Sequence, residues 1–416
     1  MSVNETPSLA FDHSAPHTSR PPRVLVLTAG FGEGHNAAAR ALAAAFQKID
    51  GLHTAKIIDA FELASPRFNA AARRFYLRLI NDAPQLWSRI YDWIGQSDLV
   101  PRRLWFFRGE IRVLAELLAR ERPTAICCTY PLYGFLLNRI ARDHPGIVPP
   151  VFNVVTDSIS IHPLWWRAGG DGWFMPNEDS AAVLDRVGIN PAAVHVSGFP
   201  VPAFFSEQAG VLSPPDLTAG VSPRVLHIIN SGTLHAEETA RRLLTETDWS
   251  ITCAVGRDRK LQDKLQRLAT RRKQPGQILG WTDQIPHLLM THHAVVSKAG
   301  GATTQESIAA LCPMIVSQIV PGQEEGNYEL LRRHSAGALA QTPDAVLHQL
   351  RRAFADNGRV WREWRSALRP LAYPDAAKGI AQHVLRATTP KSAAALRPAS
   401  RLPGSLPDLK SSAAHA

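Results

Sequence analysis

The chain has 416 residues, of which 45% are hydrophobic and 20% are charged, the balance of a globular protein with a sizeable core. No apolar run reaches the roughly 18 to 20 residues that cross a bilayer. The four cysteines have no metal-ligand spacing, so we expect reduced thiols and no metal site. We also expect a cytoplasmic chain without an export signal. The net charge of +10 favours an anionic partner, whether nucleic acid, a membrane surface or a phosphorylated substrate.

Short apolar runs alternate with helix-like segments along most of the chain. Runs such as "RVLVLTA", "TAICCTY" and "AVVSKAG" are typical of parallel strands buried on both faces. The alternation occurs twice, which predicts an α/β protein with two Rossmann-like domains facing a cleft. We place the domains at residues 23–205 and 224–387, joined by a linker at 206–223, with the last helix able to pack back on the first domain. The Pro- and Ser-rich ends, 1–22 and 388–416, read as disordered tails.

The first motif is "VLVLTAGFGEGHNAAARALAAAF", residues 24–46. A strand leads into a loop with three glycines, and a helix is expected to open at His35 or Asn36. The free N–H groups of such a helix start favour oxygen-rich or anionic ligands. The glycine spacing is not that of a dinucleotide fingerprint, and His35 is open to two interpretations, a capping residue or a general base.

The second motif is "VVTDSISIHPLWWRAGGDGWFMPNE", residues 154–178. Asp157 stands at the carboxyl end of a predicted parallel strand, where side chains point into the cleft. It could orient a histidine or accept a proton, or it could cap the following turn. His162 and Trp165 follow within eight residues of Asp157.

The third motif is "SKAGGATTQESIAALCPMIVSQIVPGQEEGN", residues 297–327. A strand delivers Gly300 and Gly301 to the start of a helix, where backbone N–H groups can hold phosphate oxygens. Glu306, expected in the first turn of that helix, could accept ribose hydroxyls or stabilise the helix dipole.

Together the three motifs resemble the GT-B glycosyltransferases of the monogalactosyldiacylglycerol synthase and processive diacylglycerol glucosyltransferase group, related to the peptidoglycan lipid-intermediate GlcNAc transferase. The resemblance extends over roughly residues 23–385, and "VTD…HPLW" and "KAGGATTQES…GQEEGN" are its most specific parts. It implies a UDP-sugar-dependent hexosyltransferase that inverts the sugar linkage and acts on a lipid hydroxyl, with diacylglycerol as the favoured acceptor. It also implies no tightly bound cofactor and no obligatory metal.

The resemblance assigns roles residue by residue. His35 would be the base, with Asp157 as its rival or orienting partner. Residues on the acceptor side would be Gly32, Gly34, His162 and Trp165. Residues that bind the donor would be Ser231, Gly232, Gly280, Trp281, Gly300, Gly301, Ala302, Thr303, Thr304, Glu306, Gln323 and Glu324.

One loop departs from the family pattern. Where relatives often carry a glycine-rich loop after the first strand of the second domain, this chain reads "HIINSGTLHAEE", with Gly232 between Ser231 and Thr233. That departure leaves open a non-catalytic UDP-sugar-binding protein. The motifs are also compatible with a transferase that uses a different lipid or a soluble acceptor, and with a UDP-GlcNAc epimerase. Glucose and galactose are not distinguished.

Residues 67–122 combine charge and aromatic side chains. They hold 11 basic and 6 acidic residues, half of the net charge. Tryptophan and tyrosine favour membrane interfaces, while arginine meets anionic head groups. We expect this segment to dock on an anionic membrane at the inner face of the cell and admit the lipid; the alternative is that its aromatics pack inward. Its helical spacing, without an RNA-module signature, argues against nucleic acid. The aromatic side chains are Phe75, Tyr76, Trp87, Tyr91, Trp93, Trp105, Phe106 and Phe107.

Overall fold

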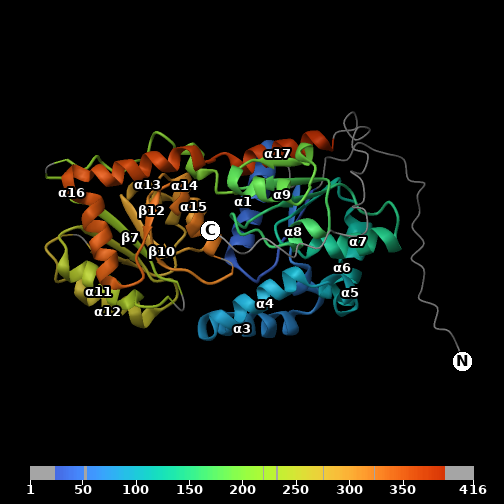
Figure 1. Ribbon diagram of the computed structural model, residues 1–416, viewed down its shortest axis with the longest axis horizontal. Helices are drawn as coiled ribbons and strands as arrows, with labels where there is room; N and C mark the ends of the chain where they lie inside the picture. Colours follow the sequence, from blue (N-terminus) through green and yellow to red (C-terminus); the bar gives the residue numbers. More distant parts are fainter. Residues whose placement is uncertain are drawn as a thin grey trace, which may run out of the picture.

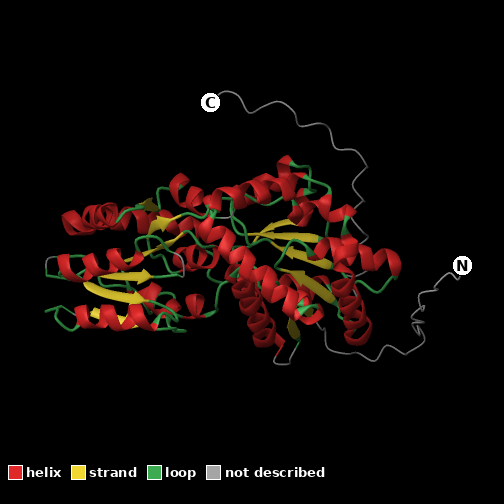
Figure 2. Cartoon of the chain, turned by 90° about the horizontal axis from the view of Figure 1, so that it is seen from below, coloured by secondary structure: helices red, strands yellow, loops and turns green. Residues whose placement is uncertain are grey.

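The computed structural model describes residues 24–50, 54–218, 220–230, 233–274, 276–322 and 324–388. The chain forms two α/β lobes side by side (Figure 1), each with a central sheet covered by helices (Figure 2). The two sheets and their topology confirm the predicted fold class. The predicted disordered tails lie outside the described residues, except for residue 388.

The N-terminal lobe contains a six-stranded parallel sheet with the order β2-β1-β3-β4-β5-β6. Most of its strands are buried on both faces, which explains their continuous apolar sequences. The strands are β1 (Val24–Leu27), β2 (Ala55–Ile58), β3 (Ala125–Cys128), β4 (Val151–Val154), β5 (Gly172–Met175) and β6 (Val194–Val196). The helices are α1 (Glu33–Asp50), α2 (Ala60–Ala64), α3 (Pro66–Asp82), α4 (Pro84–Gln96), α5 (Leu99–Arg102), η1 (Leu104–Phe107), α6 (Arg108–Glu121), α7 (Tyr133–Asp143), α8 (Leu164–Arg167), α9 (Glu178–Arg186), η2 (Pro191–Ala193) and α10 (Phe204–Glu207).

The C-terminal lobe repeats the design with the strand order β12-β11-β10-β7-β8-β9, again all parallel. The strands are β7 (Arg224–Ile228), β8 (Ser250–Ala254), β9 (Gly276–Leu279), β10 (Ala294–Lys298), β11 (Met314–Gln318) and β12 (Gly337–Leu339). The helices are α11 (Ala236–Glu246), α12 (Arg259–Ala269), α13 (Ile285–Thr291), α14 (Gly301–Ala309), α15 (Glu325–Arg333), α16 (Pro343–Leu368), η3 (Arg369–Leu371) and α17 (Ala376–Ala387).

The end of the chain ties the lobes together. Helix α16 is interrupted by non-helical backbone at residues 355–358, and the chain then runs along the top of both lobes in Figure 1. Its last helix, α17, lies against α1 of the first lobe. Ile380 and Val384 share a buried apolar cluster there with Leu42 and Phe46.

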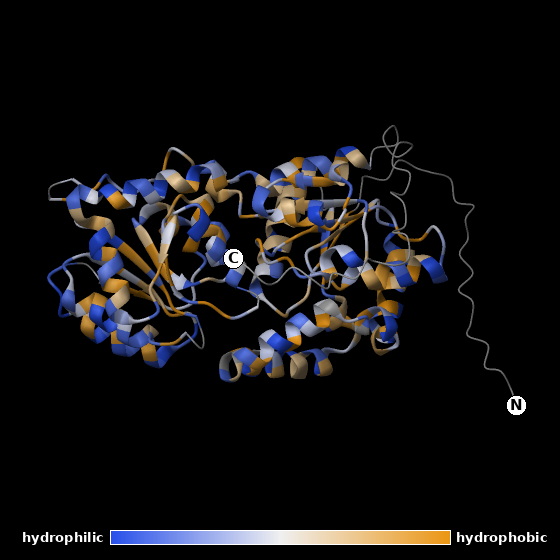
Figure 3. Cartoon of the chain, viewed as in Figure 1, coloured by the Kyte–Doolittle hydropathy of each residue, from blue (hydrophilic) through white to orange (hydrophobic). Residues whose placement is uncertain are grey.

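Helices α3 and α4 lie apart from the N-terminal sheet, beneath the cleft between the lobes (Figure 1). Apolar and polar residues alternate along both helices (Figure 3). Their aromatic side chains divide between packed and exposed ones, since Tyr76 packs edge-to-face on Trp87 while Phe75 and Trp93 are 67% and 57% exposed. Among the described residues, no helix is both long and apolar enough to cross a membrane.

Candidate active site

A cavity of about 220 Å³ lies between the lobes, where the carboxyl ends of both sheets meet. Loops that follow β1 and β4 supply one wall, and loops that follow β10 and β11 supply the other. This is where ligands bind in doubly wound sheets. Of the residues predicted as site members, those that line it are Gly32, Gly34, His35, Asp157, Gly300, Gly301, Ala302, Thr303 and Glu324.

His35 lies in the first turn of α1, because the helix begins at Glu33, two residues before the earliest predicted start. Glu33 in that turn suits the positive end of the helix dipole. The Nδ1 atom of His35 lies 2.8 Å from Oγ1 of Thr156, and the imidazole also interacts with the backbone of Thr129. When Nδ1 carries a proton that it donates to Thr156, Nε2 is left as the acceptor. Nε2 lies on the side of Gly32, which lines the cavity.

Burial lowers the pKa of His35 below its ordinary value of 6.5, while the charge of Asp157 opposes that shift. The imidazole is therefore neutral near pH 7 and able to accept a proton. Its ring also packs edge-to-face on Tyr130, with centroids 5.1 Å apart, which fixes its orientation.

Asp157 is held by the segment that follows it. The indole Nε1 of Trp165 donates to its Oδ2 at 2.8 Å, and the backbone N–H of His162 donates to the same oxygen at 3.3 Å. Trp165 thus lies behind the carboxylate and does not line the cavity.

His162 is also absent from the cavity wall. Its Nδ1 accepts from the N–H of Leu164, and its Nε2 lies 3.1 Å from the carbonyl oxygen of Tyr91 on α4. Arg167 acts alongside it by donating to the carbonyl oxygens of Gly95 and Ser97. The segment after Asp157 therefore fastens α4 beneath the cleft.

The start of α14 forms the wall opposite His35. Its N-cap residue Gly300 makes no side-chain hydrogen bond to the helix, and the first turn has no acidic residue. Backbone N–H groups of Gly301 to Thr303 are thus free of side-chain caps. A Cβ built on Gly34 would lie 3.7 Å from the backbone nitrogen of Ala302, so the starts of α1 and α14 nearly touch.

Lys298 was not predicted as a site residue, yet it lines the cavity at the end of β10. Its ammonium forms an ion pair with the buried carboxylate of Glu324, and the N–H of Val320 donates to the other oxygen of Glu324 at 3.0 Å. Both side chains lie over Gly300. The sequence signal was a lysine two residues before a glycine pair at a helix start, which places a cation beside the free N–H groups of that helix start.

Asn327 is a second unpredicted member of the cavity wall. Its Nδ2 donates to the carbonyl oxygen of Ala299 at 2.9 Å, while its buried Oδ1 has no hydrogen-bond partner within the described structure. An unpaired buried oxygen is costly unless a ligand satisfies it. The signal for Asn327 was its place at the end of "GQEEGN".

Two predicted donor residues of α14 do not line the cavity. The hydroxyl of Thr304 is directed to the sulfur of Met314 at 3.8 Å. Glu306 lies in the second turn and not the first, because α14 already begins at Gly301. Its carboxyl lies near Arg40 and Glu33 of α1, and burial raises its pKa to about 7.

The remaining predicted donor residues are apart from this cavity or outside the described residues. Gly280 and Trp281 follow β9 and are absent from the cavity wall, and the indole of Trp281 is 71% exposed. Ser231, Gly232 and Gln323 lie outside the described residues. Within the described ranges, no group of three or more histidine, cysteine or acidic side chains could hold a metal ion.

Aromatic side chains line the cavity on the side of α3. Phe31 stacks on Tyr130 and meets Tyr76 edge-to-face, with centroids 6.1 and 6.3 Å apart. Tyr76 and Ile80 bring α3 into the cavity wall. The cavity wall on this side of His35 is therefore largely aromatic and apolar.

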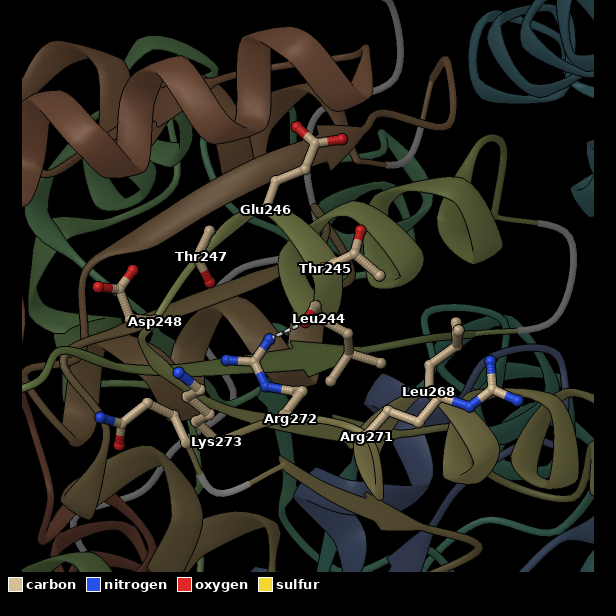
Figure 4. Close-up of a pocket in the computed structure, with 10 residues that line it drawn as sticks. Leu244, Thr245, Glu246, Thr247, Asp248, Leu268, Arg271, Arg272 and Lys273 are labelled. Atoms are coloured by element: carbon tan, nitrogen blue, oxygen red, sulfur yellow. Dashed lines mark hydrogen bonds between the residues drawn. The ribbon is translucent and has the colours of Figure 1, made fainter.

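A larger hollow of about 660 Å³ lies elsewhere, between the ends of α11 and α12 (Figure 4). There the guanidinium of Arg272 donates to the carbonyl oxygens of Leu243, Leu244 and Trp249. Arg272 thus closes the carboxyl end of α11. None of the predicted site residues lines this hollow.

Comparison with known proteins supports the resemblance. Residues 35–201 match the family model of monogalactosyldiacylglycerol (MGDG) synthase. A processive diacylglycerol beta-glucosyltransferase of Bacillus subtilis is 24% identical over 372 residues, which cover 88% of this chain and 95% of that protein.

Solved structures agree on the fold. Acinetobacter baumannii MurG superposes with a TM-score of 0.58 at 16% identity, covering 88% of this chain and all of that one. The UDP-GlcNAc 2-epimerase of Neisseria meningitidis, bound to UDP-GlcNAc, superposes with a TM-score of 0.54 at 14% identity and the same coverage. The resemblance stated from sequence is thus confirmed, and the chain has the GT-B fold.

Proposed function

We propose that this protein transfers a hexose from a UDP-sugar to the hydroxyl of a lipid acceptor, with diacylglycerol as the favoured acceptor and inversion at the anomeric carbon. The class of enzyme, a hexosyltransferase, rests on the family match and on the distant homology across both lobes. The sugar, the acceptor and the roles of individual residues are the proposal.

The observation that supports it most is the cavity itself. A neutral imidazole on one wall faces an uncapped helix start and a lysine on the other. Transfer requires this combination, since a base must take the acceptor proton while the departing diphosphate gains negative charge.

The reaction is a single displacement. The acceptor oxygen attacks the anomeric carbon, the bond from that carbon to the diphosphate oxygen breaks, and UDP leaves with the electron pair. Nε2 of His35 takes the acceptor proton, while Thr156 holds Nδ1. The charge of Asp157 stabilises the imidazolium that forms.

The start of α14 and Lys298 would receive the diphosphate. Free N–H groups at the helix start supply fixed donors, and Lys298 can exchange Glu324 for a phosphate oxygen. Glu324 would then be released toward the sugar hydroxyls, where Asn327 offers its unpaired oxygen. We retain a donor role for Glu306, Gly280 and Trp281, together with Gln323, as part of this proposal.

The α3–α4 region would bring the acceptor to the base. Exposed aromatic side chains and arginines on this region suit an anionic membrane surface, with apolar Tyr76 and Ile80 leading inward to the cavity. Sedimentation with vesicles tests this step. We expect binding to anionic vesicles that salt weakens; equal pelleting with neutral vesicles, insensitive to salt, would contradict it.

A transfer assay with labelled sugar tests the function. Purified protein is incubated with radiolabelled UDP-glucose or UDP-galactose and either diacylglycerol in vesicles or a soluble alcohol acceptor. We expect label in the organic phase, in a product whose mass is that of diacylglycerol plus one hexose or more. Label that stays in intact or epimerised UDP-sugar would contradict transfer, and label on the soluble alcohol alone would contradict the lipid acceptor.

A further inference from the structure

The turn at Ser158 and Ile159 connects the cavity wall that carries His35 and Asp157 to the C-terminal lobe. It directly follows Thr156 and Asp157, which contact or face His35. Ile159 has a φ of +54°, in the left-handed region. A β-branched residue is a genuine outlier there, and such backbone persists only where surrounding contacts hold it.

The contacts that hold the turn come from both lobes. Within its own lobe, the N–H of Ile159 donates to Oγ of Ser180 at 3.0 Å. From the C-terminal lobe, Nε2 of Gln305 donates to Oγ of Ser158 at 2.9 Å, and both side chains are buried. Ile159 itself packs against the apolar cluster beneath the C-terminal sheet.

Gly326 lies against the backbone of the turn. A Cβ built at this position of α15 would overlap the carbonyl oxygen of Ser158 and would lie 2.7 Å from the nitrogen of Ser160. The backbone of the turn therefore rests directly on α15. Contact between the lobes thus explains the second glycine of "GQEEGN", and no ligand is needed to explain it.

The two residues that hold the turn belong to the elements that form the donor wall. Gln305 follows Thr303 by two residues on α14, and Gly326 follows Glu324 by two at the start of α15. We propose that Gln305 and Gly326 are positioning residues through which the donor lobe sets Thr156 and Asp157, and hence the imidazole of His35. This inference rests on the proposed function of the cavity.

Positioning by this turn explains why its conformation is strained. When the C-terminal lobe contacts the turn, the backbone is held at Ile159 and Asp157 faces His35. When those contacts are lost, the turn relaxes and the imidazole of His35 loses its alignment. A displacement near 1 Å is enough to cost about a hundredfold in rate. Donor binding is affected less, since the N–H groups of Gly301 to Thr303 belong to the backbone of α14 and keep their direction when the turn shifts.

The test compares Gly326→Ala with Gly379→Ala, a matched helix glycine on α17 whose added Cβ would meet no atom within 4 Å. For Gly326→Ala we expect kcat to fall at least about tenfold while the affinity for UDP, measured by calorimetry, stays within about twofold. Gly379→Ala should leave both unchanged. Equal loss of kcat and UDP affinity in Gly326→Ala, or wild-type values of both in a folded variant, would overturn the proposal.

A second readout does not depend on catalysis. Modification of His35 by diethyl pyrocarbonate, measured by mass spectrometry against exposed His348, should be roughly threefold faster in Gly326→Ala because the strained turn no longer seats the imidazole. An unchanged rate would contradict the positioning role. If the wild-type protein transfers sugar to no acceptor, the proposed function fails, yet this measurement still decides the inference.

If Gly326→Ala does not fold, the hydrogen bond between the lobes provides the test. Gln305→Leu and Ser158→Ala each remove it, and the double variant should lower kcat no more than the more impaired single variant. Ser307→Ala serves as control, since it removes a buried hydroxyl of α14 whose partners, the carbonyl oxygen of Thr304 and the sulfur of Met314, both belong to the C-terminal lobe. Additive losses, or a loss in Ser307→Ala as large as in Gln305→Leu, would overturn the proposal.

Discussion

The starts of α1 and α14 lie against each other in the cleft, and they differ in charge. Both follow a buried strand through a glycine-containing loop. The start of α1 carries Glu33, whose exposed side chain pairs with Arg40. The start of α14 carries no acidic residue and has Lys298 beside it.

Under the proposed function, this difference would direct the diphosphate to one helix start. The positive end of α1 already has a carboxylate in its first turn, so a phosphate there would meet a like charge. The positive end of α14 has uncapped N–H groups and a cation beside it, so it favours an anion. Under the proposed function, one of two similar glycine motifs would then present the base and the other would receive the leaving diphosphate.

The largest expected effect concerns the base on α1. In His35→Ala, transfer should fall by about two orders of magnitude or more because no group at Nε2 takes the proton, while UDP should bind as in the wild type. Transfer assays and calorimetry measure the two quantities. Near-normal turnover would move the base to Asp157, and Asp157→Asn would then be the deciding variant.

A carboxylate in the first turn of α14, like Glu33 in α1, should weaken UDP binding. Thr303→Glu places a carboxylate in the first turn of α14, beside the proposed diphosphate. UDP affinity should fall at least about tenfold, or 1.4 kcal/mol, while thermal stability is kept or slightly raised by the helix dipole. Thr303→Gln has the same size without the charge and should lose much less. Equal losses in both variants would show that size, and not charge, sets the effect.

Much of the fold could be predicted because parallel strands buried on both faces have continuous apolar sequences. β12 was not predicted, since its sequence "GAL" has no β-branched residue and it forms only by pairing with β11. The start of α1 was placed two residues late, because glycines at residues 32 and 34 read as loop while Glu33 favours the helix.

The site was predictable where a motif carries its own geometry and was not where distant segments meet. His35 and Asp157 follow strands of the N-terminal sheet, and the start of α14 follows a strand of the C-terminal sheet, so each motif lies at the carboxyl end of its own sheet. The position of α4 depends on Arg167, which reaches carbonyl oxygens about 70 residues away in sequence. The left-handed backbone of Ile159 could not be predicted either, because the contacts around it come from residues distant in sequence in both lobes, such as Ser180 and Gln305.

The third prediction tests the cation beside α14. Lys298→Met leaves the buried carboxylate of Glu324 without its counter-ion, with one N–H donor remaining. We expect a loss of roughly 3 kcal/mol in the free energy of unfolding, measured by denaturant titration, together with weaker UDP binding. The double variant Lys298→Met, Glu324→Gln should recover much of the stability and little of the UDP affinity. Recovery of both would remove Lys298 from the proposed diphosphate site.

The smallest expected effect concerns Glu306, which lies where the two helix starts adjoin. Burial raises its pKa from 4.5 to about 7, so the folded protein holds this proton more tightly than the unfolded chain. Stability should therefore fall as the pH rises from about 4.5 to about 7 and level off above, by about 1 kcal/mol for this half-buried group. In Glu306→Gln this contribution disappears, so the variant should be more stable than the wild type at pH 8 and little different at pH 4.5, with UDP bound several-fold more weakly if the ribose role holds. A stability difference that does not change between these pH values would show that the carboxyl titrates alike in the folded and unfolded chain, and that the junction of α1 and α14 is open to solvent.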